Sequence, residues 1–271
     1  MKKSRLPVLM YHRVLTPEER KTIAATPYEI LKDNFIAQLQ FLKKEGFQSY
    51  TIDELWLPSH ANHRCACPRG VAITFDDGYV DNYLHAFPVL QEFGYKATFF
   101  VIVNKIGSRD FMSWSQLLDM HRCGMSIQSH TLNHGALATL PWEHAYEEIC
   151  EARQILQREL RHPANFISFP HGSYNARVIQ AVLAAGYSGW CNSDFGYHST
   201  EGIALGIPRI IVRDRHTLAD FESLVYGRGP RYARSKMTAG LRRAMARTVG
   251  MSNYQRLYLK YYHKDGEGES S

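Results

Sequence analysis

The chain has 271 residues, of which 45% are hydrophobic and 21% charged, a composition that excludes disordered and collagen-like classes and is typical of a folded protein. Its five scattered cysteines argue against an extracellular disulfide framework. The formal charge of +6 is uneven, because residues 231–264 hold nine of the 32 Lys and Arg and no acidic residue, whereas the first 230 residues carry 23 basic and 23 acidic side chains.

Short apolar runs alternate with helical patterns along the first 230 residues. Continuous apolar runs predict strands, and apolar residues spaced three and four apart predict helices. In chain order we expect strands at 7–12, 71–75, 96–103, 125–130, 165–170, 187–191 and 208–212, and helices at 32–46, 82–94, 113–124, 142–160, 175–186 and 217–227. Such repeated units indicate a parallel sheet covered by helices. Periodicity leaves two architectures open, an α/β barrel and an open doubly wound sheet.

Ionisable residues stand at the ends of several predicted strands, where functional residues gather in α/β folds. They are Asp76, Asp77, His130, His134, His12 and Arg209. Adjacent carboxylates repel, and burying a charge is costly unless it is paired or bound to a metal. Two histidines and one carboxylate are a common ligand set for a catalytic divalent metal. One aspartate can then bind the metal while its neighbour serves as a general base.

Each of these features also has a structural explanation. An Asp-Asp-Gly sequence forms turns and helix caps, and 13 histidines make a His-x3-His pair a weak motif. His12 fits a core histidine, and Arg209 fits a structural ion pair. The joint pattern, in which every group stands at a strand end, favours an active site.

These motifs resemble those of the polysaccharide deacetylases, also called the NodB-homology domain or carbohydrate esterase family 4. TFDDG at 74–78 resembles the first family motif, SHTLNH at 129–134 the second, and SFPHGSYN at 168–175 the third. The resemblance covers about residues 5–226 and implies an α/β fold with a distorted (β/α)7-type barrel. It also implies hydrolysis of an acetyl group, usually from an N-acetylated sugar. We expect a catalytic domain at 1–230 and a basic amphipathic tail at 231–271.

The resemblance further implies a role for individual residues. Asp76 would be the general base, while Asp77, His130 and His134 would bind a divalent metal, commonly Zn2+, with Co2+ or Ni2+ as alternatives. The backbone N–H of His171 would help to hold the oxyanion. Two aromatic residues near the third motif and a strand end are candidates for stacking on sugar rings, namely Tyr174 and Trp190.

The chain departs from the family pattern in its third and last motifs. Ser168 stands where many members have an arginine, and His171 replaces a tyrosine. The late Leu-x-Leu-His-Asp motif that supplies the acid is absent, because the sequence around His216 matches it poorly.

Two other stretches, LMYHRV near the start and PRIIV late in the chain, resemble a circularly permuted subgroup of the family. In that subgroup an N-terminal Tyr-His motif supplies the acid. This resemblance implies that His12 is the acid and that Arg209 orients Asp76. Other activities stay open, namely an O-acetyl esterase or deformylase acting on a lipid-linked sugar, and a carbohydrate-binding pseudoenzyme.

The basic tail carries a second pattern. Apolar residues recur there at helical spacing among arginines and lysines, namely Leu241, Met245, Tyr254, Leu257, Tyr258 and Tyr261. A basic amphipathic helix can lie on an anionic membrane, so residues 231–264 are candidates for peripheral membrane contact. The alternatives are packing against the barrel and disorder. Nucleic acid is not an expected partner, because no recognised binding motif accompanies the charge.

Targeting signals are not visible in the sequence. The apolar run near the start is broken by Pro7 and ends at His12, and the longest run, residues 97–103, is too short to cross a bilayer. We therefore expect a cytoplasmic protein, which the tail can bring to the inner face of the membrane.

Overall fold

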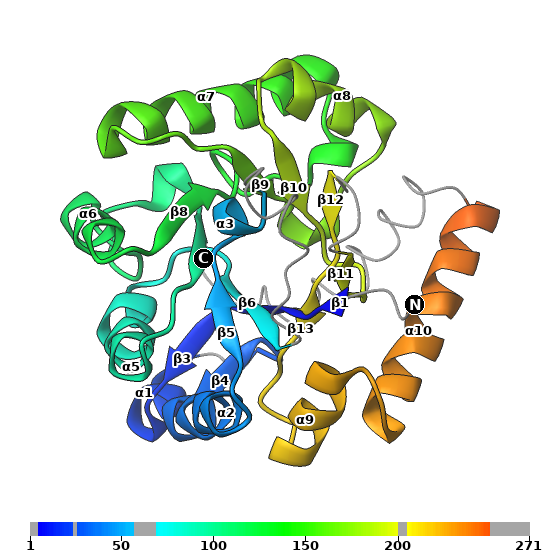
Figure 1. Ribbon diagram of the computed structural model, residues 1–271. Helices are drawn as coiled ribbons and strands as arrows, with labels where there is room; N and C mark the ends of the chain where they lie inside the picture. Colours follow the sequence, from blue (N-terminus) through cyan, green and yellow to red (C-terminus); the bar gives the residue numbers. More distant parts are fainter. Residues whose placement is uncertain (1–4, 24–25, 57–68, 200–204, 250–271) are drawn as a thin grey trace.

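A parallel sheet of nine strands forms the centre of the protein, which we describe from a computed structural model over residues 5–23, 26–56, 69–199 and 205–249 (Figure 1). In chain order the strands are β2 (Val8–Tyr11), β5 (Gln48–Tyr50), β6 (Gly70–Phe75), β7 (Thr98–Val101), β8 (Ser126–Ser129), β9 (Phe166–Ser168), β10 (Gly189–Cys191), β12 (Gly206–Ile207) and β13 (Ile210–Ile211). Their order across the sheet is β12-β10-β9-β8-β7-β6-β2-β13, and β5 also pairs with β6.

The sheet curls until its two edges approach each other. β12 and β13 stand at opposite ends of the strand order, yet only Pro208 and Arg209 separate them in the chain. Three residue steps span at most about 11 Å, so the two edges are held close together. The predicted barrel-type fold is therefore confirmed, as a curled parallel sheet with a seam between β12 and β13, and the open doubly wound alternative is excluded.

Most of the helices surround the outside of this sheet (Figure 1). In chain order the helices are α1 (Pro17–Thr22), α2 (Lys32–Lys44), α3 (Ile52–Trp56), the π-helical η1 (Asn82–Ala86), α5 (Phe87–Phe93), α6 (Trp114–Arg122), α7 (Trp142–Leu160), α8 (Ala176–Ala184), α9 (Leu218–Tyr226) and α10 (Pro230–Val249). Short 3-10 turns complete the connections at η2 (Val103–Lys105), η3 (Leu137–Thr139) and η4 (Pro170–Gly172). Capping boxes fix the starts of several helices, among them α1 at Thr16, α6 at Ser113 and α9 at Thr217.

Two small pairs of strands lie beside the main sheet. β3 (Arg13–Leu15) pairs in parallel with β4 (Glu29–Leu31), and β1 (Arg5–Leu6) pairs antiparallel with β11 (His198–Ser199). β3 begins two residues after the end of β2, so this pair lies close to the carboxyl end of β2.

Apolar side chains from the sheet and the helices form three buried clusters, and one of them packs α2 against the sheet. Phe75 of β6 and Phe99 of β7 stack with ring centroids 4.8 Å apart, and Leu39 and Leu42 of α2 are fully buried in the same cluster. This packing orders the strands whose carboxyl ends carry the predicted site.

The predicted tail begins one residue into α10, which packs beside α9. The tail residues from 250 onward, including Tyr254, Leu257, Tyr258 and Tyr261, lie outside the described part of the chain. No helix in the described part combines the length and the apolar character needed to cross a bilayer.

Candidate active site

The carboxyl ends of neighbouring strands bring the predicted residues together. β9, β8, β7, β6 and β2 are consecutive in the sheet and parallel, so their carboxyl ends share one edge. His12 follows β2, Asp76 and Asp77 follow β6, and His130 follows β8. Arg209 reaches the same place from the seam between β12 and β13.

Asp77, His130 and His134 form a compact cluster. Asp77 Oδ1 lies 3.2 Å from Nε2 of His130 and 3.2 Å from Nε2 of His134, and all three potential ligand atoms lie within 4.8 Å of one another. Asp77 Oδ1 is buried, and among the described residues it has no partner with hydrogen-bond geometry. A buried carboxylate oxygen facing two ring nitrogens that do not bond to it fits a divalent metal, which accepts this donor set.

The surroundings of both histidines fix their orientation. His130 Nδ1 lies 2.9 Å from the backbone carbonyl of Ser168, so Nδ1 donates its proton and the lone pair is left at Nε2. The backbone N–H of His134 donates to Thr131 Oγ1 at 3.0 Å. The first contact orients the ring of His130 and the second holds the backbone of His134, and Nε2 of each histidine faces Oδ1 of Asp77 at 3.2 Å.

Backbone strain is concentrated around this cluster. Among the described residues, five non-glycine residues have a positive φ, and four of them lie here: Asp77 (74°), Thr131 (66°), His134 (68°) and His171 (57°). Left-handed conformations cost free energy for residues with a Cβ and are typical of functional sites. The folded core thus holds these side chains in positions that the local chain disfavours.

Asp76 occupies a different environment from its neighbour. Arg209 donates to both of its carboxylate oxygens at 2.7 Å, and Ser168 Oγ donates to Oδ2 at 3.0 Å. Arg209 is fully buried and its guanidinium has five acceptors: Asp76 Oδ1 and Oδ2, Ser168 Oγ (2.7 Å), Thr74 Oγ1 (3.3 Å) and the carbonyl of Asn192 (3.1 Å). These acceptors match the five N–H groups of an arginine, so the predicted contact is present and fully satisfied.

The two carboxylates remain ionised despite their burial. Burial raises the pKa of Asp76, but the charges of Arg209 and His130 outweigh it and hold that pKa below its usual value. Burial also raises the pKa of Asp77, but contacts with His130 and His134 hold it well below its usual value. Asp76 is thus paired with a permanent cation, whereas Asp77 depends on two imidazoles.

His12 lies beside both carboxylates. Burial lowers the pKa of His12, although the charges of Asp77 and Asp76 act in the opposite direction. Its ring packs 4.8 Å from that of Tyr28, and its Nδ1 atom is buried with no hydrogen-bond partner in the described part of the chain. The structure therefore brings this histidine into the site, as the sequence predicted.

The predicted substrate residues differ in their accessibility. His171 is exposed, and its ring lies 4.6 Å from that of His134. Tyr174 is partly exposed, stacks on Phe169 at 5.2 Å and donates from its hydroxyl to Asp194 at 2.8 Å. His171 and Tyr174 thus border the cluster, and their roles stay predictions.

Trp190 is placed differently from the sequence interpretation. It is only 7% exposed, and it packs in an apolar cluster with Phe169. Its indole lies against Gly206, where an added Cβ would come within 2.8 Å of Nε1. The glycine makes room for the ring inside the fold, so Trp190 offers little surface for stacking on a sugar.

Two neighbours of the site were not recognised from the sequence. Ser168, noted only as a departure from the family pattern, places its hydroxyl between Asp76 and Arg209. Tyr79 follows the Asp-Asp-Gly turn, lies under the guanidinium of Arg13 at 4.5 Å and is affected by the charge of Asp77. Burial raises the pKa of Tyr79, so its phenol stays protonated near the cluster. The only hint in the sequence that Tyr79 lies near the site was its position directly after the TFDDG motif.

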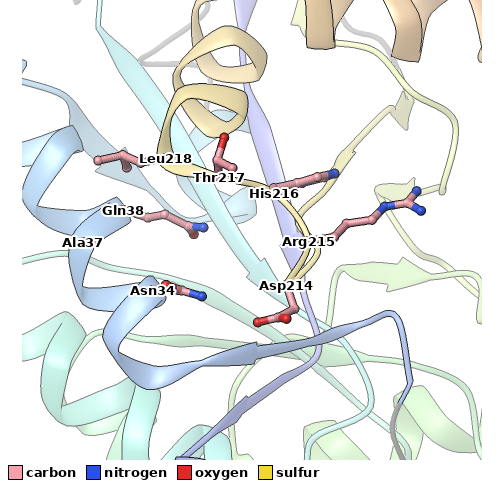
Figure 2. A pocket seen from close by; sticks show the side chains of 8 residues that line it. All are labelled: Asn34, Ala37, Gln38, Asp214, Arg215, His216, Thr217 and Leu218. Carbon is pink, nitrogen blue, oxygen red and sulfur yellow. The ribbon is translucent and has the colours of Figure 1, made fainter.

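A separate pocket of about 270 Å3 lies between α2 and the start of α9 (Figure 2). Its eight lining residues include none of the predicted site residues; they are Asn34, Ala37, Gln38, Asp214, Arg215, His216, Thr217 and Leu218. Gln38 accepts a hydrogen bond of 2.7 Å from the hydroxyl of Tyr11, the residue before His12. Through this contact the pocket is connected to β2, the strand that precedes His12, but it is separate from the cluster of Asp77, His130 and His134.

Comparisons with known proteins agree with this geometry. A family model described as polysaccharide deacetylase matches residues 63–190, a span that includes the Asp77, His130 and His134 cluster but neither His12 nor Arg209. The Bacillus subtilis protein YxkH, whose name places it among the polysaccharide deacetylases, is 30% identical over 211 residues, which cover 78% of this chain and 72% of that protein.

Two further proteins relate the chain to deacetylases. The poly-beta-1,6-N-acetyl-D-glucosamine N-deacetylase of Staphylococcus epidermidis is 28% identical over 173 residues, which cover 59% of each chain. The Streptococcus pyogenes deacetylase PplD, solved in complex with acetate, superposes with a TM-score of 0.70 at 27% identity over 83% of this chain and 99% of that one. The chain therefore belongs to the polysaccharide deacetylases, a family of hydrolases.

Proposed function

We propose that the protein is a metal-dependent hydrolase that removes acetyl groups from an N-acetylated glycan. The observation that carries the proposal is the contrast between two adjacent carboxylates. Asp76 is clamped by a buried arginine, whereas Asp77 Oδ1 faces two ring nitrogens without hydrogen-bonding to either. Two neighbouring carboxylates in such different surroundings are suited to different roles in catalysis.

Asp77, His130 and His134 would hold the metal, for which Zn2+ is the first candidate and Co2+ or Ni2+ are alternatives. A divalent cation at such a site supplies a Lewis acid that polarises a carbonyl and lowers the pKa of water. The carbonyl of Ser168 supports this role, because its contact with Nδ1 of His130 keeps Nε2 available as a ligand.

Asp76 would accept the proton of the attacking water. Oδ2 already receives hydrogen bonds from Arg209 and Ser168, whereas Oδ1 receives one from Arg209. Each carboxylate oxygen has two lone pairs, so Oδ1 keeps one that can take a proton. Arg209 holds the carboxylate in place and keeps it ionised until the transfer occurs.

His12 would donate a proton to the departing amine. It lies near Asp77 and Asp76, and its lowered pKa makes its protonated form a readier proton donor than an ordinary imidazolium. The backbone N–H of His171, the fourth residue of the third motif, would stabilise the negative charge on the carbonyl oxygen.

An N-acetylated glycan is supported as the substrate class by the named relatives. The Staphylococcus epidermidis protein carries the name of an N-acetyl-D-glucosamine polymer deacetylase, and PplD was solved with acetate, the product of such a reaction. Hydrolysis of an amide or of an ester would release acetate, so the name of the Staphylococcus epidermidis protein is what favours an N-acetyl amide over an O-acetyl ester.

Acetate release tests the proposal directly. Wild-type protein would be stripped of metal, reloaded with Zn2+, Co2+ or Ni2+, and assayed on N-acetylglucosamine oligomers and on N- and O-acetylated model compounds. We expect release that depends on added metal and that falls by about 10^2 to 10^4 in Asp76→Asn. Asp33→Asn, which changes an exposed aspartate in α2, is the matched control and should retain the wild-type rate. Release that is unaffected by stripping, or by Asp76→Asn, would overturn the assignment.

A further inference from the structure

Helix α10 carries an apolar stripe that faces away from the barrel. Met237, Leu241 and Met245 are 62%, 60% and 56% exposed, and their spacing of four residues places them along one side of the helix. The opposite side is the partly buried one and includes Tyr232, whose ring packs against the rings of Phe195 and Tyr197. The other partly buried residues on that side are Ser235 and Ala239.

The charge of α10 has a single sign. Every residue of this helix that is charged at neutral pH is basic, and the set is Arg231, Arg234, Lys236, Arg242, Arg243 and Arg247. Arg234, Lys236 and Arg242 are exposed. The helix lies at the rim of the molecule beside α9, so its outer side is open to a large surface (Figure 1).

We propose that α10 docks lengthwise on an anionic phospholipid surface, with Met237, Leu241 and Met245 inserted between the lipid headgroups. An amphipathic helix binds such a surface through apolar insertion together with attraction between basic side chains and acidic lipids. Both requirements are met on α10. The inference does not depend on the proposed chemistry of the active site.

Other binding partners for the apolar stripe are less compatible with the positive charge of α10. A second copy of α10 would bring two wholly basic helices together, and like charges facing one another oppose association. A nucleic acid would neutralise the charge but would leave the three apolar side chains in water. An anionic bilayer provides both the negative charge and the apolar layer.

Vesicle flotation of the full chain tests the proposal. The probes are vesicles of phosphatidylcholine alone and of phosphatidylcholine with phosphatidylserine. We expect binding only to the second kind, a decrease as salt is raised, and about a fivefold loss for Arg242→Gln, which removes one charge near the surface. The triple variant Met237→Ser, Leu241→Ser, Met245→Ser should lose at least tenfold, whereas Leu183→Ser, on an exposed leucine of α8, should bind like wild type.

Circular dichroism and the melting temperature of each variant establish that it is folded. Absence of binding to acidic vesicles, or equal binding of the triple variant and wild type, would overturn the proposal. A self-association that the triple variant abolishes, with no vesicle binding by wild type, would instead assign the stripe to a second copy of the chain.

Discussion

Arg209 and Asp76 are joined by two hydrogen bonds of 2.7 Å although 133 residues separate them in the chain. Both side chains are buried, and the guanidinium lies over the ring of Phe100 at 5.6 Å. A planar fork of donors on a carboxylate fixes both the position and the plane of that carboxylate. The contact thus connects the residue directly before β13, the last strand of the sheet, to the proposed base.

Removing Arg209 should lower both the stability of the fold and the rate of acetate release. Arg209→Ala leaves a buried carboxylate without its counterion, which we expect to lower the free energy of unfolding by about 3–5 kcal/mol. Arg209→Lys keeps the positive charge but lacks the planar guanidinium that binds both oxygens of Asp76. The decrease in the free energy of unfolding should therefore be smaller, while acetate release still falls. Urea denaturation measures the first effect. The exposed Arg158→Ala should change stability by no more than about 0.5 kcal/mol, and equal losses in both alanine variants would contradict the prediction.

Loss of one histidine should abolish tight zinc binding. His134→Ala removes one of the three proposed ligand atoms, so we expect affinity to fall by more than about a hundredfold. Calorimetric titration of metal-free protein with Zn2+ measures the change, and zinc should raise the melting temperature of wild type but not of the variant. His144→Ala, on an exposed histidine of α7, serves as the control. Undiminished zinc binding by His134→Ala would place the metal elsewhere.

The glycine that follows the two aspartates should resist substitution. Gly78 has φ +83°, and a Cβ there would lie 2.9 Å from Cγ1 of Val101. We expect Gly78→Ala to cost at least about 1–2 kcal/mol and to reduce activity by displacing Asp77. Gly240 in α10 has open space around it, so Gly240→Ala should instead add up to about 1 kcal/mol. Thermal unfolding of both variants should therefore shift in opposite directions.

His216 should make stability fall in acid. Burial, together with the charge of Arg231 2.6 Å away, lowers the pKa of His216 to about 4. A histidine in the unfolded chain has a pKa near about 6.5. Between about pH 6.5 and 4, His216 is therefore protonated in the unfolded state but largely neutral in the folded state. Stability is therefore highest above pH 6.5 and falls by about 3 kcal/mol as the pH decreases to 4.

His216→Asn removes this titration and should flatten the dependence of the unfolding free energy on pH over the same window. Denaturation at pH 4.5, 5.5 and 7 measures the slope, and His144→Asn supplies the comparison at an exposed position. An unchanged slope in His216→Asn would show that another group controls acid stability.

Much of the fold was predictable because buried parallel strands and long helices leave clear patterns. The helix expected at 142–160 coincides with α7, and the strand expected at 71–75 lies within β6. β5 was missed, since Gln48–Tyr50 has no apolar run and is a strand only through its pairing with β6. The choice between a barrel and an open sheet depended on the pairing of β13 with β2, which joins residues about 200 positions apart and has no local signature.

The sequence predicted the residues of the proposed metal site but not the contacts that support them. His130 and His134 were found because motif spacing is local, and Arg209 because a short late stretch resembled a subgroup of the family. The bridging role of Ser168 could not be read from the sequence, since its two partners, Asp76 and Arg209, lie 92 and 41 residues away. Trp190 was a candidate for stacking on a sugar because nothing local shows that Gly206 of the neighbouring strand makes room for its ring inside the fold.

The seam between β12 and β13 also affects how the protein is made. During synthesis Asp76 leaves the ribosome long before Arg209, so an incomplete chain has the proposed base without its counterion. Such a chain also lacks β13, the strand that pairs with β2 beside His12. A nascent or truncated product therefore lacks the assembled proposed site, and we expect it to gain hydrolytic activity only when the last strand docks.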